Sequence, residues 1–196
     1  KKKKKILKSS KKRPSNCKKS RTRMEKSLSR PDLKKIESLL LDRVSIRNSC
    51  HNDAQFISQN MKETDLKECY IHQVTPFTAL HLPIVEDKPY TFTAFFDEEP
   101  VAMFGVCERD IYEGYLCGDI WCLTTDKIHK IPITFHKVTK LIINYLLDHF
   151  DYLENIVPSE HIETINWLQN LGFTVTSEVI QINEYSCLRF VKWKET

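Results

Sequence analysis

The chain has 196 residues, of which 41% are hydrophobic and 29% charged, enough for one globular domain with a core plus an additional segment. No run approaches the roughly 18 to 20 consecutive apolar residues of a membrane span, and no secretory signal pattern opens the sequence, so we expect no membrane span. The net charge of +4 is unevenly divided, because residues 1–35 carry 17 Lys and Arg against two acidic residues, whereas residues 36–196 carry 13 against 24.

Residues 1–30, the basic segment, consist mainly of Lys, Arg and Ser. Because they contain too few apolar residues to offset the entropy lost on folding, we predict that they are disordered and that the folded domain spans residues 31–196. Several interpretations of the basic segment stay open. It is an arm that neutralises the phosphates of nucleic acid, a solubilising or localisation segment, or a segment that folds back onto its own acidic domain.

Seven cysteines are scattered along the chain, without a Cys-x-x-Cys pair and without histidines at a zinc-ligand spacing. We therefore expect no structural metal and free thiols in a reducing compartment. Cys107 and Cys122 lie inside apolar runs, which is typical of small buried side chains rather than of nucleophiles.

The first half of the domain is predicted to mix helices and strands. In chain order we expect a helix from Pro31 through Leu40, a strand at Val44–Arg47, a helix capped by Asp53, a helix from Thr64 through Cys69, and a loop with at most one strand over residues 72–89. Strands follow at Tyr90–Phe96, Val101–Cys107 and Tyr115–Leu123, then a long helix at Pro132–Phe150 and a strand at Leu153–Val157.

The stretch Glu160–Val175 predicts a short helix that turns directly into a strand. Its apolar residues recur at steps of three and four, and Gly172 suits the left-handed position that ends a helix. A final hairpin is expected at Val179–Ile182 and Ser186–Trp193. This order predicts an α+β (α/β) fold with a mostly antiparallel mixed sheet and flanking helices.

The element order, together with the sequence W-L-x-x-L-G-F at Trp167–Phe173, resembles the GCN5-related N-acetyltransferase (GNAT) fold. That fold implies a sheet splayed between its fourth and fifth strands. The run from Val106 to Trp193 is similar to the internal virion protein A family of T7-like short-tailed phages. The matching positions are Cys117, Trp121, Thr124, Asp126, Phe135, Leu141, Ile142, Tyr145, Asp151, Leu153, Asn155, Val157, His161, Ile162, Leu168 and Gly172.

The GNAT resemblance implies a coenzyme A site at the turn before the long helix. GNAT enzymes have glycines there, which let backbone N–H groups approach the pyrophosphate. This chain has Lys127-Ile128-His129-Lys130-Ile131-Pro132 at that place, so the usual cradle is degenerate. The candidate cofactor-binding residues are Leu123, Thr124, Thr125, Lys127, His129, Lys130 and His161. A solvated charged turn is the alternative for the three basic side chains.

The resemblance also implies a general base and an acid that protonates the departing thiolate. The GNAT tyrosine four residues before the glycine is Leu168 here, which cannot transfer a proton. Asp119, on the fourth strand, is the candidate base, because burial raises the pKa of a carboxyl group. Tyr115 and Tyr152 could serve as the substitute acid, and Tyr152 is the candidate that we assign. We interpret Trp121 and Trp167 as core residues rather than as ligand-stacking rings.

Two functions follow from the resemblance. The first is a phage-type GNAT-fold binding or assembly factor with a degenerate acyl-coenzyme A site, located in the virion interior or host cytoplasm, with virion proteins as partners and nucleic acid bound by the basic segment. The second is an acetyl-coenzyme A dependent N-acetyltransferase with a divergent cofactor loop. We expect an open first turn of the long helix and a splayed gap between the fourth and fifth strands if the second holds.

Overall fold

The computed structural model describes residues 43–109 and 114–195. The predicted disorder of the basic segment, the domain boundary after residue 30 and the helix expected at Pro31 lie outside these residues. No helix within the described ranges is long and apolar enough to cross a membrane.

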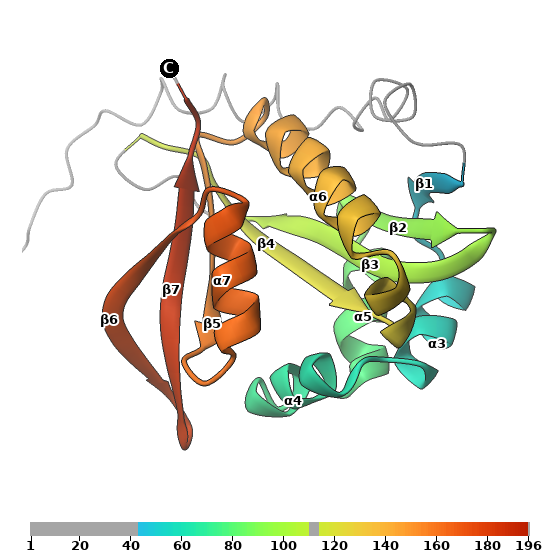
Figure 1. Ribbon diagram of the computed structural model, residues 1–196, viewed down its shortest axis with the longest axis horizontal. Helices are drawn as coiled ribbons and strands as arrows, with labels where there is room; N and C mark the ends of the chain where they lie inside the picture. Colours follow the sequence, from blue (N-terminus) through green and yellow to red (C-terminus); the bar gives the residue numbers. More distant parts are fainter. Residues whose placement is uncertain (1–42, 110–113, 196) are drawn as a thin grey trace, which may run out of the picture.

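The described chain forms one seven-stranded mixed sheet in the order β1-β2-β3-β4-β5-β7-β6 (Figure 1). The strands are β1 (Val44–Asn48), β2 (Thr91–Phe96), β3 (Glu99–Glu108), β4 (Cys117–Thr124), β5 (Tyr152–Pro158), β6 (Thr174–Ile182) and β7 (Tyr185–Trp193). All neighbours are antiparallel except β4 and β5. The mixed, mostly antiparallel sheet is therefore confirmed.

The two parallel strands pair over three residues only, Cys117–Asp119 against Tyr152–Glu154, and then separate. We call the gap beyond these residues the fork. It divides the sheet into β1–β4 and β5–β7, and it confirms the predicted splay between the fourth and fifth strands.

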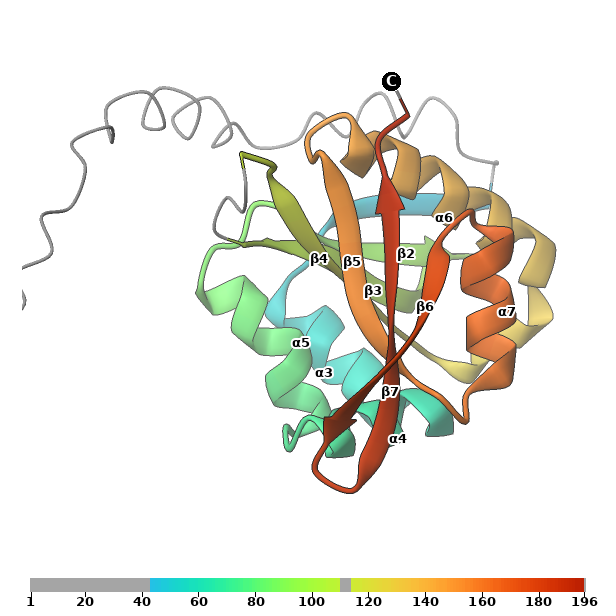
Figure 2. The same ribbon diagram turned by 90° about the vertical axis from the view of Figure 1, so that its left-hand side faces the viewer.

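Helices cover the two faces of the sheet unequally (Figure 2). On one face, α6 (Pro132–Leu147) covers the first half and α7 (Ile162–Asn170) the second. On the other face, α3 (His51–Gln59) and α5 (Pro76–Val85) cover the first half. The helix α4 (Glu63–Ile71) lies at the open end of the fork, and the 3-10 helix η1 (Asp126–Lys130) precedes α6.

The prediction for residues 72–89 was wrong, because Pro76–Val85 is the helix α5. The two prolines that suggested a loop are compatible with the helix. Pro76 occupies its first turn, where no intrahelical N–H is needed, and the Thr75 hydroxyl caps the turn by accepting a hydrogen bond from the Thr78 N–H at 3.1 Å. Pro83 lies inside the helix, two residues before its end, and its missing N–H costs the helix one hydrogen bond, to the Ala79 carbonyl.

Two predicted helix starts also shift. The helix α3 begins at His51, and Asp53 is its third residue, where its carboxylate accepts a hydrogen bond from the Cys50 N–H at 2.9 Å. Asp53 thus takes the second half of a capping box instead of the cap position. The helix α4 begins at Glu63 rather than after Thr64.

The remaining strands and helices agree with prediction within a few residues at their ends. Gly172 has φ +85° and ends α7 as expected. The last part of the chain forms one long β6 with an irregularity between Val175 and Val179, so the strand after Gly172 and the first strand of the hairpin are continuous. The six described cysteines are free, as predicted.

Two clusters form the core. The larger packs α6 and α7 against β2–β5 and β7, with Leu146 and Leu153 fully buried. The smaller packs α3, α4 and α5 against the opposite face of β3 and β4, around Ile57, Leu80 and Met103. The fork lies between these clusters, so any space there is walled by apolar side chains.

Candidate functional site

A cavity of about 320 Å³ lies at the fork. The residues that line it are Glu68, Cys69, His72, Val74, Ala79, Ala94, Ala102, Phe104, Ile120, Trp121, Cys122, Leu123, Phe135, Val138, Thr139, Ile142, Ile143, Asn155, Ile156, Val157, Thr164, Trp167, Leu168, Leu171, Phe173 and Phe190. Its volume is at the low end of the range for small-molecule sites, about 300 to 1,000 Å³.

The residues that line the cavity lie on both faces of β4, and we call these two groups the α6 lobe and the α4 lobe. Successive side chains of a strand point to opposite faces, so Ile120 and Cys122 belong to one lobe and Trp121 and Leu123 to the other. The first lobe, the α6 lobe, lies between α6, α7 and the sheet and is almost wholly apolar. The second, the α4 lobe, is bounded by α4 and the start of α5 and contains the carboxylate of Glu68.

At the edge of β4 that faces the fork, one residue has backbone N–H and C=O groups without a hydrogen-bond partner among the described residues. The Ile120 carbonyl accepts from the Asn155 side chain at 2.8 Å, and the Thr124 N–H donates to Asp65 at 2.7 Å. Because alternate residues point their backbone groups the same way, the N–H and C=O of Cys122 also face the fork. The described residues provide no partner for them on that side.

Asn155 determines where the fork begins. Its side-chain amide donates to the Ile120 carbonyl and its oxygen accepts from the Ile156 N–H at 2.8 Å, so one side chain forms a further rung between β4 and β5. Beyond it the strands are free to separate. Sequence reasoning used Asn155 only as a position matching a family pattern and gave it no role.

The turn between β4 and α6 is a 3-10 helix rather than a glycine loop. The Ile131 N–H is engaged with the Ile128 carbonyl, and the first bond of α6 runs from Phe135 to the Ile131 carbonyl. Pro132 has no N–H. The N–H groups of Ile133 and Thr134 have no partner in the described ranges, so the first turn of α6 is partly open.

The candidate basic residues of this turn differ in their surroundings. Lys127 forms an ion pair with Glu99 at 2.8 Å, so it points toward the β2–β3 turn. His129 and Lys130 are exposed. Lys130 also borders a second hollow of about 480 Å³ formed with Arg43, Phe96 and the first turn of α6.

The other candidate cofactor-binding residues surround the end of β4 and the start of α7. Leu123 lines the cavity. Thr124 is buried, and its hydroxyl donates to Asp65 at 2.6 Å; the buried Thr125 hydroxyl lies 3.4 Å from the Val101 carbonyl. His161 Nδ1 lies 3.4 Å from a carboxylate oxygen of Glu68. Thr124 and Thr125 therefore serve the fold, and the assignment of the set to a cofactor stays a prediction.

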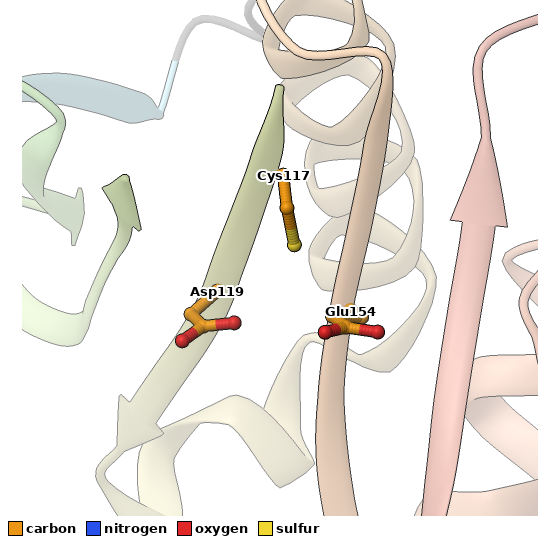
Figure 3. A group of neighbouring side chains, drawn as sticks. All are labelled: Cys117, Asp119 and Glu154. Carbon is orange, nitrogen blue, oxygen red and sulfur yellow. The ribbon is translucent and has the colours of Figure 1, made fainter. Parts of the chain in front are cut away.

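The candidate catalytic residues lie at the paired end of β4 and β5, outside the residues that line the cavity. Figure 3 shows Asp119 beside Cys117 on β4 and Glu154 opposite them on β5. Burial raises the pKa of Asp119, although its bond to Arg109 at 2.6 Å opposes this shift. Burial, together with a hydrogen bond to Cys117, raises the pKa of Tyr152 to about 12. Their catalytic roles stay predictions.

The carboxylates in this group are already compensated by arginines. Glu154 is buried and accepts hydrogen bonds from Arg109 at 2.5 Å and from Arg189 at 2.5 Å, and Arg109 also bridges to Asp119. The ligand atoms of Cys117, Asp119 and Glu154 lie within 4.8 Å of one another, a spacing that could hold a cation. Two guanidinium groups occupy the same carboxylates, so the group is better described as an ion-pair network that fastens β4, β5 and β7.

Both tryptophans discussed above line the cavity while packing against the core. Trp167 stacks on Phe135 with ring centroids 5.4 Å apart, and Trp121 packs against the smaller cluster. Burial raises the pKa of the Cys122 thiol to about 12, which disfavours its thiolate form. Leu168 is buried at the cavity wall, so α7 presents an apolar surface where GNAT enzymes were expected to have a tyrosine.

No protein-family model matches the sequence, and no curated protein matches it either. Solved structures match over most of their length. Spermidine N-acetyltransferase from Vibrio cholerae, in complex with coenzyme A and spermine, has a TM-score of 0.60 at 10% identity and covers 79% of this chain and 97% of its own. A probable acetyltransferase from Staphylococcus epidermidis has a TM-score of 0.59 at 16% identity, covering 78% and 99%.

A putative acetyltransferase from Salmonella typhimurium, solved with acetyl-coenzyme A, has a TM-score of 0.56 at 13% identity and covers 79% of this chain and 95% of its own. None of these similarities links the chain to phage virion proteins. A GNAT-family acetyltransferase from Streptococcus pneumoniae is similar to the same extent, with a TM-score of 0.56. Together with the forked seven-stranded sheet, these similarities show that the chain has the fold of the GCN5-related N-acetyltransferases.

Proposed function

We propose that the protein is an acetyl-coenzyme A dependent N-acetyltransferase whose reaction centre is the fork. One observation carries this proposal. The cavity passes the edge of β4 at Cys122, the residue of this edge whose backbone N–H has no partner among the described residues. The solved neighbours that contain acetyl-coenzyme A or coenzyme A support it. The virion-assembly hypothesis has no comparable support.

The α6 lobe suits the thioester arm. Its lining is mostly apolar, and its floor is formed by Ala94 and Ala102, which lie directly opposite each other on β2 and β3. The Cys122 N–H at its end would donate a hydrogen bond to the thioester carbonyl. A donor in a desolvated site stabilises the negative charge that develops on such an oxygen when an amine attacks, typically by about 3 to 4 kcal/mol.

The turn before α6 offers the phosphates of acetyl-coenzyme A fewer backbone donors than a glycine loop would. The N–H groups of Ile133 and Thr134, the positive end of the α6 dipole and the exposed Lys130 remain available for an anion. Pro132 removes one donor and η1 occupies the space of the loop. We therefore expect weak binding that depends on Lys130.

The departing thiolate has no proton donor from α7 at the usual position, because Leu168 stands there. The described residues that line the cavity include no tyrosine, so solvent is the proton source that this arrangement supports. Reaction would then be slow relative to an enzyme with a positioned acid, since general acid catalysis typically contributes a factor of about 10² to 10⁴.

Calorimetric titration of the full chain tests the proposal. Acetyl-coenzyme A should bind at least about tenfold more tightly than adenosine 3′,5′-bisphosphate, which has similar phosphates but no arm for the cavity, a difference of about 1.4 kcal/mol. Lys130→Glu should weaken binding of both, whereas Lys137→Glu makes the same charge change on an exposed site further along α6 and should have little effect.

A second variant tests the cavity itself. Ala102→Leu would fill the floor of the α6 lobe and should remove the preference for acetyl-coenzyme A while leaving binding of the bisphosphate unchanged. Circular dichroism would verify that the variant is folded. Equal affinity of the unmodified chain for both ligands would show that only the positive charges bind, and the proposal would be abandoned.

A further inference from the structure

The α4 lobe contains the polar groups of the cavity that neither the fold nor the thioester arm requires. Glu68 projects from α4 into the lobe, and 29% of its side chain is exposed. Its one polar contact among the described residues is with His161 Nδ1 at 3.4 Å, and the His161 side chain is only 9% exposed. A carboxylate that lines a cavity beside a histidine is a suitable site for an ammonium group that must lose a proton.

The helix α4 is fastened across the fork by contacts on two sides. The Asn183 side chain, in the β6–β7 turn, donates to the Ile71 carbonyl at 3.0 Å and accepts from Gln73 at 3.1 Å. The Glu68–His161 contact joins α4 to the start of α7 on the other side. Figure 1 shows α4 beside the β6–β7 turn at the open end of the fork. These contacts hold Glu68 in place at the fork.

The surroundings of the lobe are negatively charged. Glu160 and Glu163 flank His161, and Glu184 follows Asn183 in the turn; all three are exposed. The nearby lysines of α4 are paired within the helix region, Lys62 with Asp65 and Lys67 with Glu63. A polybasic acceptor is therefore attracted to this opening, whereas an acidic one is repelled.

We propose that the acceptor is the side chain of a lysine in a polybasic segment, that its ammonium group binds Glu68 and His161 in the α4 lobe, and that the chain's own residues 1–30 supply it. This inference rests on the proposed function and names its substrate. Residues 1–30 contain 11 lysines and one acidic residue, whereas residues 36–196 carry a net charge of −11. The positive charge and the lysine amines of residues 1–30 thus complement the negative charge of the domain and the carboxylate of Glu68 in the same polypeptide.

The distance is compatible with this assignment. Lys26 precedes the first described residue, Arg43, by 17 residues, and an extended chain of that length spans about 55 Å. A domain of about 150 residues has a radius of gyration of only about 15 Å. The lysines can therefore reach the opening from the same molecule, or from a second copy.

The reaction balances without a further reagent. The lysine ammonium gives one proton to Glu68, directly or through His161, and its nitrogen attacks the thioester carbonyl carbon. A C–N bond forms, the nitrogen then loses its second proton to solvent, the C–S bond breaks, and the thiolate takes up a proton from solvent to become the free thiol of coenzyme A. The products are coenzyme A and an N-acetylated lysine in residues 1–30.

Mass spectrometry of the full chain after incubation with acetyl-coenzyme A tests the proposal. We expect acetyl groups on lysines of residues 1–30, and at least a tenfold slower incorporation in Glu68→Gln with unchanged calorimetric binding of acetyl-coenzyme A. Glu63→Gln is the matched control, because Glu63 lies on the same helix but its side chain is 81% exposed and does not line the cavity. It should acetylate at the unmodified rate.

A second variant replaces the 11 lysines by arginine, which keeps the charge but removes the nucleophile. It should incorporate no acetyl group within residues 1–30 and should acetylate an added peptide of the unmodified residues 1–30. Incorporation at the same rate in Glu68→Gln would indicate spontaneous chemistry and overturn the inference. Acetylation of an unrelated amine without modification of residues 1–30 would also overturn it and leave the proposed function intact, whereas absence of acetyl-coenzyme A binding would remove the proposed function itself.

Discussion

Asp53 illustrates how a single residue can be given the wrong role by its type alone. Aspartate before an apolar run suggested a helix cap, but the carboxylate sits in the first turn of α3 and joins three elements. It accepts hydrogen bonds from Arg47 on β1 at 2.7 Å, from the Cys50 N–H at 2.9 Å and from Thr93 on β2 at 3.1 Å. A buried carboxylate with this many donors stabilises the fold only while it is ionised.

This environment predicts a pH dependence of stability. Burial raises the pKa of Asp53, but the hydrogen bonds from Arg47 and Cys50 outweigh it, so the pKa lies below its ordinary value. A lowered folded-state pKa means that the stabilisation is present above about pH 4 and is lost as the pH falls through the folded-state value. Asp53→Asn should lower the free energy of unfolding by about 1 to 2 kcal/mol at pH 7 and by much less at pH 3.

Urea unfolding of both proteins at the two pH values measures this difference. Asp97→Asn is a suitable control, because Asp97 also pairs with an arginine, Arg43, but 42% of its side chain is exposed. Its substitution should change stability little at either pH. A pH-independent effect of Asp53→Asn would show that packing, rather than ionisation, explains the loss.

At the scale of elements, the attachment of α4 to the end of β4 keeps the fork open. Asp65 accepts hydrogen bonds from both the N–H and the hydroxyl of Thr124, and the Lys62 N–H donates to the Thr124 carbonyl at 2.9 Å. These bonds replace those that a paired β5 would supply. The same helix contributes Glu68 to the cavity, so the stability of α4 and the geometry of the site are linked.

Removing the attachment of α4 to Thr124 should therefore affect both the stability of α4 and the geometry of the site. Asp65→Ala leaves two buried donors of Thr124 without partners and should lower the free energy of unfolding by about 2 to 3 kcal/mol. Hydrogen exchange should quicken in α4 more than in β2 and β3. The control Glu63→Ala loses only an exposed pair with Lys67, worth about 0.3 to 0.5 kcal/mol. Equal effects of the two variants would contradict a special role for Asp65.

At the scale of the whole molecule, two parts of opposite charge share one chain. Independently of any catalysis, 17 Lys and Arg within residues 1–35 predict binding to polyanions without sequence preference. Deletion of residues 1–30 should abolish the retardation of DNA in a gel, and the affinity of the full chain should fall steeply with salt concentration. Unchanged DNA affinity after the deletion would contradict this prediction. It would show that the domain binds DNA despite its net negative charge.

The outline of the fold was accessible from sequence because it depends on local regularities. Apolar residues at helical or alternating spacing located most strands and the helices α6 and α7, and Gly172 marked the end of α7 through its backbone freedom. The exception was α5, because the three prolines of residues 72–89 favour a loop and two of them lie in this helix. The position of a proline within a helix decides whether it is tolerated. These positions could not be known before the bounds of α5 were known.

The candidate site was much less predictable, because it is assembled from residues distant in sequence. Glu68, Asn155 and His161 are separated by many residues, and no local pattern marks a glutamate on α4 as facing a histidine before α7. The candidates Asp119 and Tyr152 followed from their strand and type, yet they lie where β4 and β5 are still paired. Periodicity is a property of neighbouring residues, so composition and spacing were sufficient to predict most helices and strands and the uneven division of charge. A cavity is formed by surfaces that meet only after folding. The tertiary structure alone therefore decided where β4 and β5 separate and which side chains face the gap between them.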